Sequence, residues 1–446
     1  MNETNNILNE LRNQAHDCIK ELMGGLTMDL SVSATKYGAI IREREVKDAK
    51  LLLQVLFVYA ISGLSQRMLA VHAFFIGAGD ISDQAWQKKI VRCVPWLSYL
   101  LSDVLLNLTT VDRTHYKGEF VHLLDGSIFT QAGHGGQKLR LHMDYNLSVG
   151  AVEELKITDI HTAESVHAFN MKSGHIYLAD AGFGRGKNLA HVLSCKAHAL
   201  FRMTPNNVSL AKDASGKVKI NMVEKLDIKG DVLDFTCYAH SVNGKYVPVR
   251  IVAGRLPEDK ALLAKERKKR RTSKSQQKLK KETLVYAEWV ILMTTLDYNY
   301  STDFLLRMYR ARWQIELLFK RIKQFFRVTK LRKATIEHSK ALVLIWLIIW
   351  AMSERQAIAA EIYLLNKQAD MERYSPWTML NFFIRRYEAI MNSIFAFSFN
   401  FQHHFLYIFR RLRNHRAGRP NHYSYFRFCC FSSLANHDCT FALAAA

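Results

Sequence analysis

The sequence has little proline, no regular cysteine pattern and no long apolar run, and each shortage excludes a class of protein. Only 6 of its 446 residues are proline and 49% are hydrophobic, which excludes extensive disorder and allows a large core. The seven cysteines include no CxxC pair, so we predict reduced thiols in a cytosol rather than a disulfide or zinc framework. The apolar runs at residues 51–64 and 341–352 are shorter than the ~18–20 residues of a membrane span, so we expect buried core helices. The polar first residues predict no signal peptide.

Acidic residues are also scarce, with 40 Asp and Glu against 62 Lys and Arg, and the formal net charge is +22. Such an excess indicates a polyanionic partner, either nucleic acid or an anionic membrane surface. The densest basic segment, residues 265–281, has ten Lys or Arg opposed only by Glu266, and we predict a solvated, mobile segment that contacts a polyanion. Its only large apolar residue is Leu279, which argues against a basic amphipathic membrane helix and favours DNA.

Residues 1–115 have the pattern of a helical domain. Within them a helix is followed by a turn containing Gly77 and Gly79 and by a second helix that we expect to begin after an N-cap at Ser82. The second helix carries basic side chains, and the whole resembles a helix-turn-helix, although helix–Gly–helix is common in any helical bundle. We therefore predict an N-terminal DNA-binding domain at 1–115.

From residue 118 the pattern changes to short strands in the order β-β-β-α-β. Residues 139–147 alternate strictly between apolar and polar, and the first and fourth strands end at Asp125 and Asp180. The carboxyl ends of strands are where α/β sheets place ligands. We expect Asp144, on the polar side of its strand, to be solvated, and Glu164 to be a favourable charge at the positive end of a short helix.

The remaining chain divides by pattern into three regions. Residues 116–200 form the first part of the predicted core, and residues 201–283 read as a β-rich insertion that includes the basic segment. Residues 284–355 contain a further strand and a helix that complete the core. Residues 356–446 are a C-terminal region with helical character, a possible dimerisation surface and a final thirty residues without periodicity.

The helix predicted over residues 309–323, YRARWQIELLFKRIK, carries an unusual polar group. At roughly 100° per residue, Tyr309, Arg312, Glu316 and Lys323 fall within about 60° of one another. An apolar arc lies beside them, formed by Ile315, Leu318, Phe319, Ile322, Phe325 and Phe326. A lone carboxylate among two cations and a phenol suits a phosphodiester with a metal beside it.

Asp125, Asp180 and Glu316 are the candidates for that metal site. Three carboxylates can hold two Mg²⁺ ions about 3.5–4 Å apart, and without metal they would repel one another. Taken singly, Asp125 and Asp180 are each better explained as a strand-ending turn residue. Their joint position, on the first strand, the fourth strand and a late helix, favours the metal site.

The motifs that contain these residues resemble those of bacterial DDE transposases of the insertion-sequence-four family. The Y-x2-R-x3-E-x6-K signature is complete, LLDGS resembles the first aspartate motif with Ser127 close behind, and LADAGFG resembles the second with Gly182 and Phe183 in register. The resemblance covers roughly residues 50–350. It implies an α/β fold with a ribonuclease H-like mixed sheet core flanked by helices, interrupted by the β-rich insertion, with helical N-terminal and C-terminal domains.

The resemblance also implies an activity, which is metal-dependent cleavage at transposon ends and strand transfer to target DNA, through a DNA hairpin. Asp125, Asp180 and Glu316 would bind two Mg²⁺ ions, which Mn²⁺ can replace. The expected DNA contacts are Tyr309, Arg312, Lys320 and Lys323, together with Trp289. A Trp289 ring could stack on an unpaired base, with core packing as its alternative, whereas we expect Trp313 to be packed.

Three further expectations come from the resemblance alone. Synapsis of two ends implies a homodimer, and the helices after residue 340 could supply the contact. The protein would be cytoplasmic and associated with the bacterial nucleoid, without a membrane partner. The alternative to an active enzyme is a catalytically inactive transposase remnant or regulator that only binds DNA.

Overall fold

The computed structural model describes residues 26, 28–42, 44–106, 118–131, 136, 138–227, 230–274, 276, 279–325, 334–366 and 376–397. The chain divides into two compact units, residues 1–398 and 399–446, and every described residue belongs to the first. The aperiodic end of the chain therefore lies outside the described residues, as does Phe326 of the predicted apolar arc.

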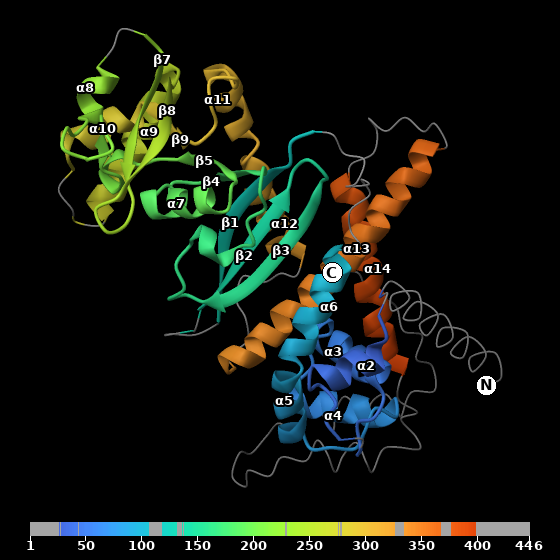
Figure 1. The fold of residues 1–446 in the computed structure, drawn as a ribbon. Helices are drawn as coiled ribbons and strands as arrows, with labels where there is room; N and C mark the ends of the chain where they lie inside the picture. Colours follow the sequence, from blue (N-terminus) through green and yellow to red (C-terminus); the bar gives the residue numbers. More distant parts are fainter. Residues whose placement is uncertain are drawn as a thin grey trace. The chain divides into compact units, whose positions relative to one another are not determined.

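The N-terminal part is a helical bundle, as its sequence pattern predicts (Figure 1). Capping side chains explain where its helices begin: Asp48 accepts hydrogen bonds from two backbone amides of the next turn, and Ser65 and Ser82 each accept one. The bundle comprises α2 (Leu30–Lys36), α3 (Ala49–Ile61), α4 (Gln66–Phe75), α5 (Asp83–Arg92) and α6 (Val94–Leu106).

One mixed nine-stranded sheet follows, in the order β3-β2-β1-β4-β5-β9-β8-β7-β6. Strand β1 pairs antiparallel with β2 and parallel with β4, and β4 pairs parallel with β5. The strands are β1 (Val121–Thr130), β2 (Lys138–Asn146), β3 (Ala151–Asp159), β4 (Ile176–Ala179), β5 (His198–Arg202), β6 (Leu210–Ala211), β7 (Val232–His240), β8 (Tyr246–Arg255) and β9 (Trp289–Thr294).

The strands expected in an insertion at 201–283 belong to this same sheet. Strand β8 pairs with β9, and β9 pairs with β5, so the sheet continues from the core strands through β8 to β7 and β6. The helices between and after the strands are η1 (Val166–Ala168), α7 (Gly186–Ser194), η2 (Pro205–Asn207), α8 (Met222–Leu226), α9 (Glu258–Lys274) and α10 (Lys281–Ala287). The short helix expected before β4 is only the single 3-10 turn η1.

The basic segment at 265–281 is not the irregular mobile stretch that its charge predicts. Most of it forms the second half of the 17-residue helix α9, whose only buried residue is Ala261. The helix is tolerated because its cations point to solvent, and because pairs such as Glu266 and Arg270 lie one turn apart.

The two faces of strands β1 and β4 are buried against different elements. Leu123 and Leu178 pack in the core cluster that also holds residues of α6, α12 (Trp313–Phe325) and α13 (Ile336–Asn366). Leu124 and Tyr177 pack in a second cluster with residues of η1 and α7. Since successive side chains of a strand alternate between faces, Asp125 lies on the α12 face and His122 on the opposite one.

The apolar helices are core helices in the described part of the chain. α13 contacts α3, α6 and α14 (Pro376–Phe397), and α3 is buried along most of its length. Residues Ile336–Ala360 are the one segment among the described residues that is long and apolar enough to cross a membrane, and 72% of its apolar window is buried inside the protein.

Candidate metal and DNA site

Asp125 and Asp180 are brought side by side by two neighbouring parallel strands. Leu124 of β1 is in register with Ala179 of β4, so the next residue of each strand is an aspartate at the same level of the sheet. Each carboxylate accepts a hydrogen bond from a following glycine amide, at 2.7 Å for Asp125 and Gly126 and at 2.8 Å for Asp180 and Gly182. Burial raises the pKa of Asp125 to about 7, and the charge of Asp180 acts in the same direction.

Glu316 approaches the same place from the helical side. The single helix predicted over 309–323 is in fact two: α11 (Thr302–Arg310) ends before a tight turn at residues 311–312, and α12 begins at Trp313. α12 contacts β1 through its buried apolar face, formed by Ile315, Leu318, Phe319 and Ile322.

Arg312, in the turn between these helices, links two of the three predicted metal ligands. Its guanidinium forms an ion pair with Glu316 and lies 3.8 Å from Oδ2 of Asp125. The structure therefore places a cation between the carboxylates of β1 and α12, with Asp180 beside Asp125. Within the described residues, the ligand atoms of Asp125, Asp180 and Glu316 do not all lie within 4.8 Å of one another.

The other residues of the signature lie around these acids. Tyr309 is 8% exposed, its hydroxyl forms no hydrogen bond of normal geometry, and burial raises its pKa. Lys323 Nζ lies 5.4 Å from the ring centre of Phe129, and the charge of Asp125 partly opposes the lowering of its pKa by burial. Lys320 is exposed on α12.

Trp289 has the core packing that we weighed against its stacking role, and Trp313 is exposed rather than packed. Trp289, the predicted stacking residue, is only 2% exposed and is covered by the Arg255 guanidinium, 4.7 Å from its ring. It fills the core, so in this structure it offers no face to a base. Trp313, which we expected to be packed, is 57% exposed beside Arg312. The first turn of a short helix can be reached by solvent on most sides, which the local sequence does not reveal.

Glu164 lies next to the candidate site, which the sequence analysis did not predict. It lies in the loop after β3, two residues before η1, and is not part of a helix start as we expected. The charge of Glu164 raises the pKa of Asp125. Burial raises the pKa of Glu164 itself, the charge of Arg140 opposes this shift, and the charge of Asp180 adds to it. No spacing rule links residue 164 to residues 125 and 180, so sequence reasoning had no signal for it.

A groove next to Asp180 connects the acidic residues to the basic helix α9. It has a volume of about 560 Å³ and begins at Ala181 and Gly182. The opposite wall carries Lys268, Arg271 and Lys280. A second groove, of about 660 Å³, lies on the N-terminal bundle and is lined mainly by cations, namely Arg42, Arg44, Lys88, Lys89 and Arg92, with Glu45 among them.

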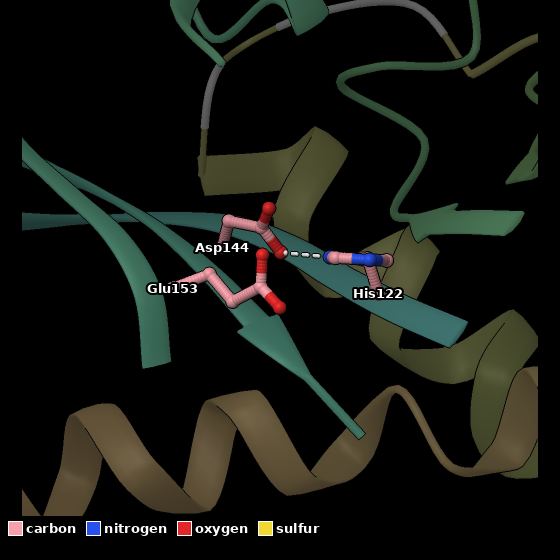
Figure 2. A group of neighbouring side chains, drawn as sticks. All are labelled: His122, Asp144 and Glu153. Atoms are coloured by element: carbon pink, nitrogen blue, oxygen red, sulfur yellow. Dashed lines mark hydrogen bonds and ion pairs between the residues drawn. The ribbon is translucent and has the colours of Figure 1, made fainter. Parts of the chain in front are cut away.

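A different polar cluster lies on the other face of the same strands. His122 of β1, Asp144 of β2 and Glu153 of β3 have ligand atoms within 4.8 Å of one another, a spacing that could hold a metal ion (Figure 2). Asp144 is only 3% exposed, so the expectation that it is solvated is wrong. Residues of the loop before β4 lie over this face, where His175 contacts His122 and Lys172 contacts Glu153, and burial raises the pKa of Asp144.

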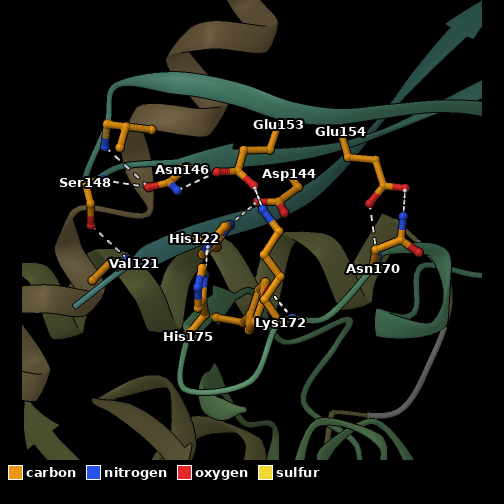
Figure 3. A network of polar contacts seen from close by, with 12 residues as sticks. Val121, His122, Asp144, Asn146, Ser148, Glu153, Glu154, Asn170, Lys172 and His175 are labelled. Atoms are coloured by element: carbon orange, nitrogen blue, oxygen red, sulfur yellow. Dashed lines mark hydrogen bonds and ion pairs between the residues drawn. The ribbon is translucent and has the colours of Figure 1, made fainter. Parts of the chain in front are cut away.

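The protein already supplies partners for this cluster. Nδ1 of His122 lies 2.8 Å from Asp144, and its Nε2 lies 2.8 Å from Nδ1 of His175 (Figure 3). Glu153 pairs with Lys172 and accepts a 2.6 Å hydrogen bond from Asn146. With its charges neutralised and its nitrogen atoms bonded, the cluster is a buried structural network.

Comparisons with known proteins agree with this architecture. A family model described as the transposase DDE domain matches residues 109–352, more than half of the chain, and the chain belongs to this family. The mixed α/β fold with its mixed sheet fits such a core.

Individual relatives carry the same description. The chain is 29% identical over 337 residues to the putative transposase InsL of insertion sequence element IS186A from Escherichia coli strain K12. The aligned region covers 74% of this chain and 91% of the relative. The chain is likewise 29% identical over 338 residues to the transposase of insertion sequence element IS421 from Escherichia coli, with the same coverage.

Proposed function

We propose that this protein is a DNA transposase that cleaves phosphodiester bonds at the ends of its element and transfers the freed strand to target DNA. The observation that carries the proposal is the cation of Arg312 held between Asp125 and Glu316, with Asp180 adjacent. Asp125 and Glu316, separated by 191 positions in the chain (316 − 125), flank one positive charge, and Asp180 lies beside Asp125, an arrangement that stability alone does not require.

The acidic residues fit divalent cations. Carboxylate oxygens are the donors that Mg²⁺ and Mn²⁺ prefer, and Arg312 shows that this pocket accepts positive charge between Asp125 and Glu316. Asp125, Asp180 and Glu316 would hold the ions. When bound, the ions neutralise the carboxylates and polarise the phosphodiester.

The side chains around the acids would hold the DNA. Tyr309 brings a buried hydroxyl without a hydrogen-bond partner, which can donate to a phosphate oxygen. Arg312 and Lys323 are cations within the site, and a guanidinium can grip a phosphate with two hydrogen bonds. Lys320 extends this positive surface along the exposed side of α12.

Two chemical steps follow from this arrangement. In the first, water attacks phosphorus, the bond from phosphorus to the 3′ oxygen breaks, and the released 3′ oxygen takes a proton. In the second, the 3′-OH attacks a phosphorus of the target strand, and the displaced 3′ oxygen takes the proton that the attacking hydroxyl loses. The side chains act by positioning and by charge, since phosphoryl transfer asks little more of a protein.

The strand would run from the acids along α9. The groove between Gly182 and the cations of α9 joins the Asp180 turn to a row of positive charge that is open to solvent. The cationic groove on α5 would contact a more distant part of the duplex through the predicted N-terminal DNA-binding domain. A hairpin would form between the two chemical steps, when the freed 3′-OH attacks a phosphorus of the opposite strand and displaces the 3′ oxygen of the flank; attack by water would then open it and restore the 3′-OH. The hairpin places a base outside the stack, and the exposed Trp313 offers an aromatic ring to receive it.

Purified protein, linear DNA carrying the element's own ends, and Mn²⁺ test the proposal. Nicks confined to the junctions between element and flank, followed by joined products, are expected. DNA that shifts in a gel but remains uncut would instead identify the inactive DNA-binding remnant. Light scattering of the complex with two end fragments should give the mass of two protomers, as the proposed homodimer requires.

A further inference from the structure

Glu164 lies beside the glycines that follow both metal-site aspartates, and its charge acts on Asp125. A methyl group built at Gly126, next to Asp125, would lie 3.0 Å from Oε1 of Glu164. A methyl group built at Gly182, two residues after Asp180, would lie 3.1 Å from Oε2 of Glu164. The two oxygens therefore point one to each aspartate turn, into space that exists because both turns carry glycine.

Buried hydrogen bonds fix this loop to the Asp180 turn. Asn188 of α7 is fully buried, accepts a 2.8 Å hydrogen bond from Ser165 Oγ, and donates one of 2.9 Å to the carbonyl of Phe183. One amide thus holds the residue after Glu164 and the chain that follows Asp180. On the other side, Nε of Arg140 lies 3.7 Å from Oε1 of Glu164.

Acidic groups gather around Glu164. Four carboxylates, those of Asp125, Asp180, Glu316 and Glu164, share the site with the cations of Arg140, Arg312 and the partly buried Lys323, and Arg202 lies close enough for its charge to act on Tyr309. Like charges this close require a counter-ion or protonation. Tyr309 is 8% exposed, and burial raises the pKa of its hydroxyl, with the charge of Asp180 acting in the same direction. The hydroxyl is a buried donor without a hydrogen bond of normal geometry, which points to a missing ligand.

We propose that Glu164 is a fourth acidic residue of the metal pocket, placed to hold a divalent cation, or the water around it, together with Asp125 and Asp180. This inference rests on the proposed function. Mg²⁺ takes only one or two protein carboxylates directly and keeps several waters, so acids more than 4.8 Å apart can serve one ion. Through this role Glu164 would set how tightly the ions bind before DNA arrives.

The test measures Mn²⁺ binding to the full chain without DNA, by the electron paramagnetic resonance signal of free Mn²⁺. Glu164→Gln is expected to weaken Mn²⁺ binding by about 10-fold or more, as loss of an acidic group near a metal usually does. Glu154→Gln is the matched control: Glu154 lies on β3, pairs with Lys156 and Asn170, and should leave the affinity within about twofold of wild type. Asp125→Asn, measured in the same way, tests whether Mn²⁺ binds at the proposed metal pocket at all.

The outcomes separate the two proposals. If Asp125→Asn weakens Mn²⁺ binding and Glu164→Gln behaves like Glu154→Gln, Glu164 has no part in the pocket. If Asp125→Asn changes nothing either, the metal site of the proposed function fails. A purely structural pair with Arg140 would lower the unfolding temperature of Glu164→Gln and spare its Mn²⁺ affinity. Should that variant not fold, Glu164→Asp keeps the charge on a shorter side chain, and wild-type affinity there would overturn the inference.

Discussion

Strands β1 and β2 carry carboxylates on both faces of the sheet, and the two faces differ in the partners that surround these carboxylates. On one face Asp144 and Glu153 are matched by His122, His175, Lys172 and Asn146, so each charge has a protein partner. On the other, Asp125 lies among Asp180, Glu164 and Glu316, four acids that share the cations of Arg140, Arg312 and Lys323, and burial raises the pKa of Asp125 to about 7. A buried acid that the protein neutralises is structural, whereas a group of acids that it leaves under-neutralised is prepared for a ligand.

The largest expected effect is on chemistry. Glu316→Gln should reduce cleavage by at least about 100-fold while DNA affinity stays near wild type, because it removes one anionic metal ligand and leaves the cations in place. Glu337→Gln, at the exposed start of α13, is the matched control and should cleave normally. Retained cutting by Glu316→Gln in a gel assay would remove this residue from the site.

Matched asparagine substitutions compare the two faces directly. Asp144→Asn should lower the free energy of unfolding by about 3 kcal/mol, because it breaks a buried ion pair with His122. Asp125→Asn should leave the stability of the metal-free protein unchanged or raise it, because it removes a charge that repels its neighbours. Urea unfolding in the presence of a chelator measures both. Equal losses at the two positions would contradict the distinction between the faces.

The exposed and buried tryptophans offer a second contrast. Trp313→Ala should reduce hairpin formation by about tenfold, since stacking one base is worth about 1–3 kcal/mol. Trp289→Phe should preserve it, because a buried ring acts through packing. A 2-aminopurine placed at the base expected to leave the stack reports the contact by its fluorescence. Normal hairpin formation by Trp313→Ala together with a loss in Trp289→Phe would instead identify Trp289 as the stacking residue.

The smallest expected effect concerns the groove along α9. Lys268→Gln and Arg271→Gln should each flatten the plot of log affinity against log salt by about 0.9, the contribution of one neutralised phosphate. Lys260→Gln, on the same helix but outside the groove lining, should leave the slope unchanged. Fluorescence anisotropy over a salt series is sufficient. If all three variants keep the wild-type slope, the DNA does not run along the groove beside α9.

Several features of the fold could be read from local patterns. The strict alternation of residues 139–147 predicted β2, and Ser82 was correctly recognised as an N-cap. Local pattern failed where distant contacts decide. The turn at residues 311–312 divides the signature helix, and the charge of residues 265–281 predicted a solvated, mobile segment where most residues form the second half of α9.

The sequence alone determined the family, because the signature with its fixed spacing and the two aspartate motifs can be recognised without a structure. It also determined that Asp125 and His122 occupy opposite faces, since strand alternation depends only on their separation of three. Only the tertiary structure decided that Glu164 meets the two aspartates, that Asp144 is buried, and that Trp313 rather than Trp289 is exposed. Those outcomes depend on which segments pack over a side chain, and packing between distant segments leaves no periodic trace in the sequence.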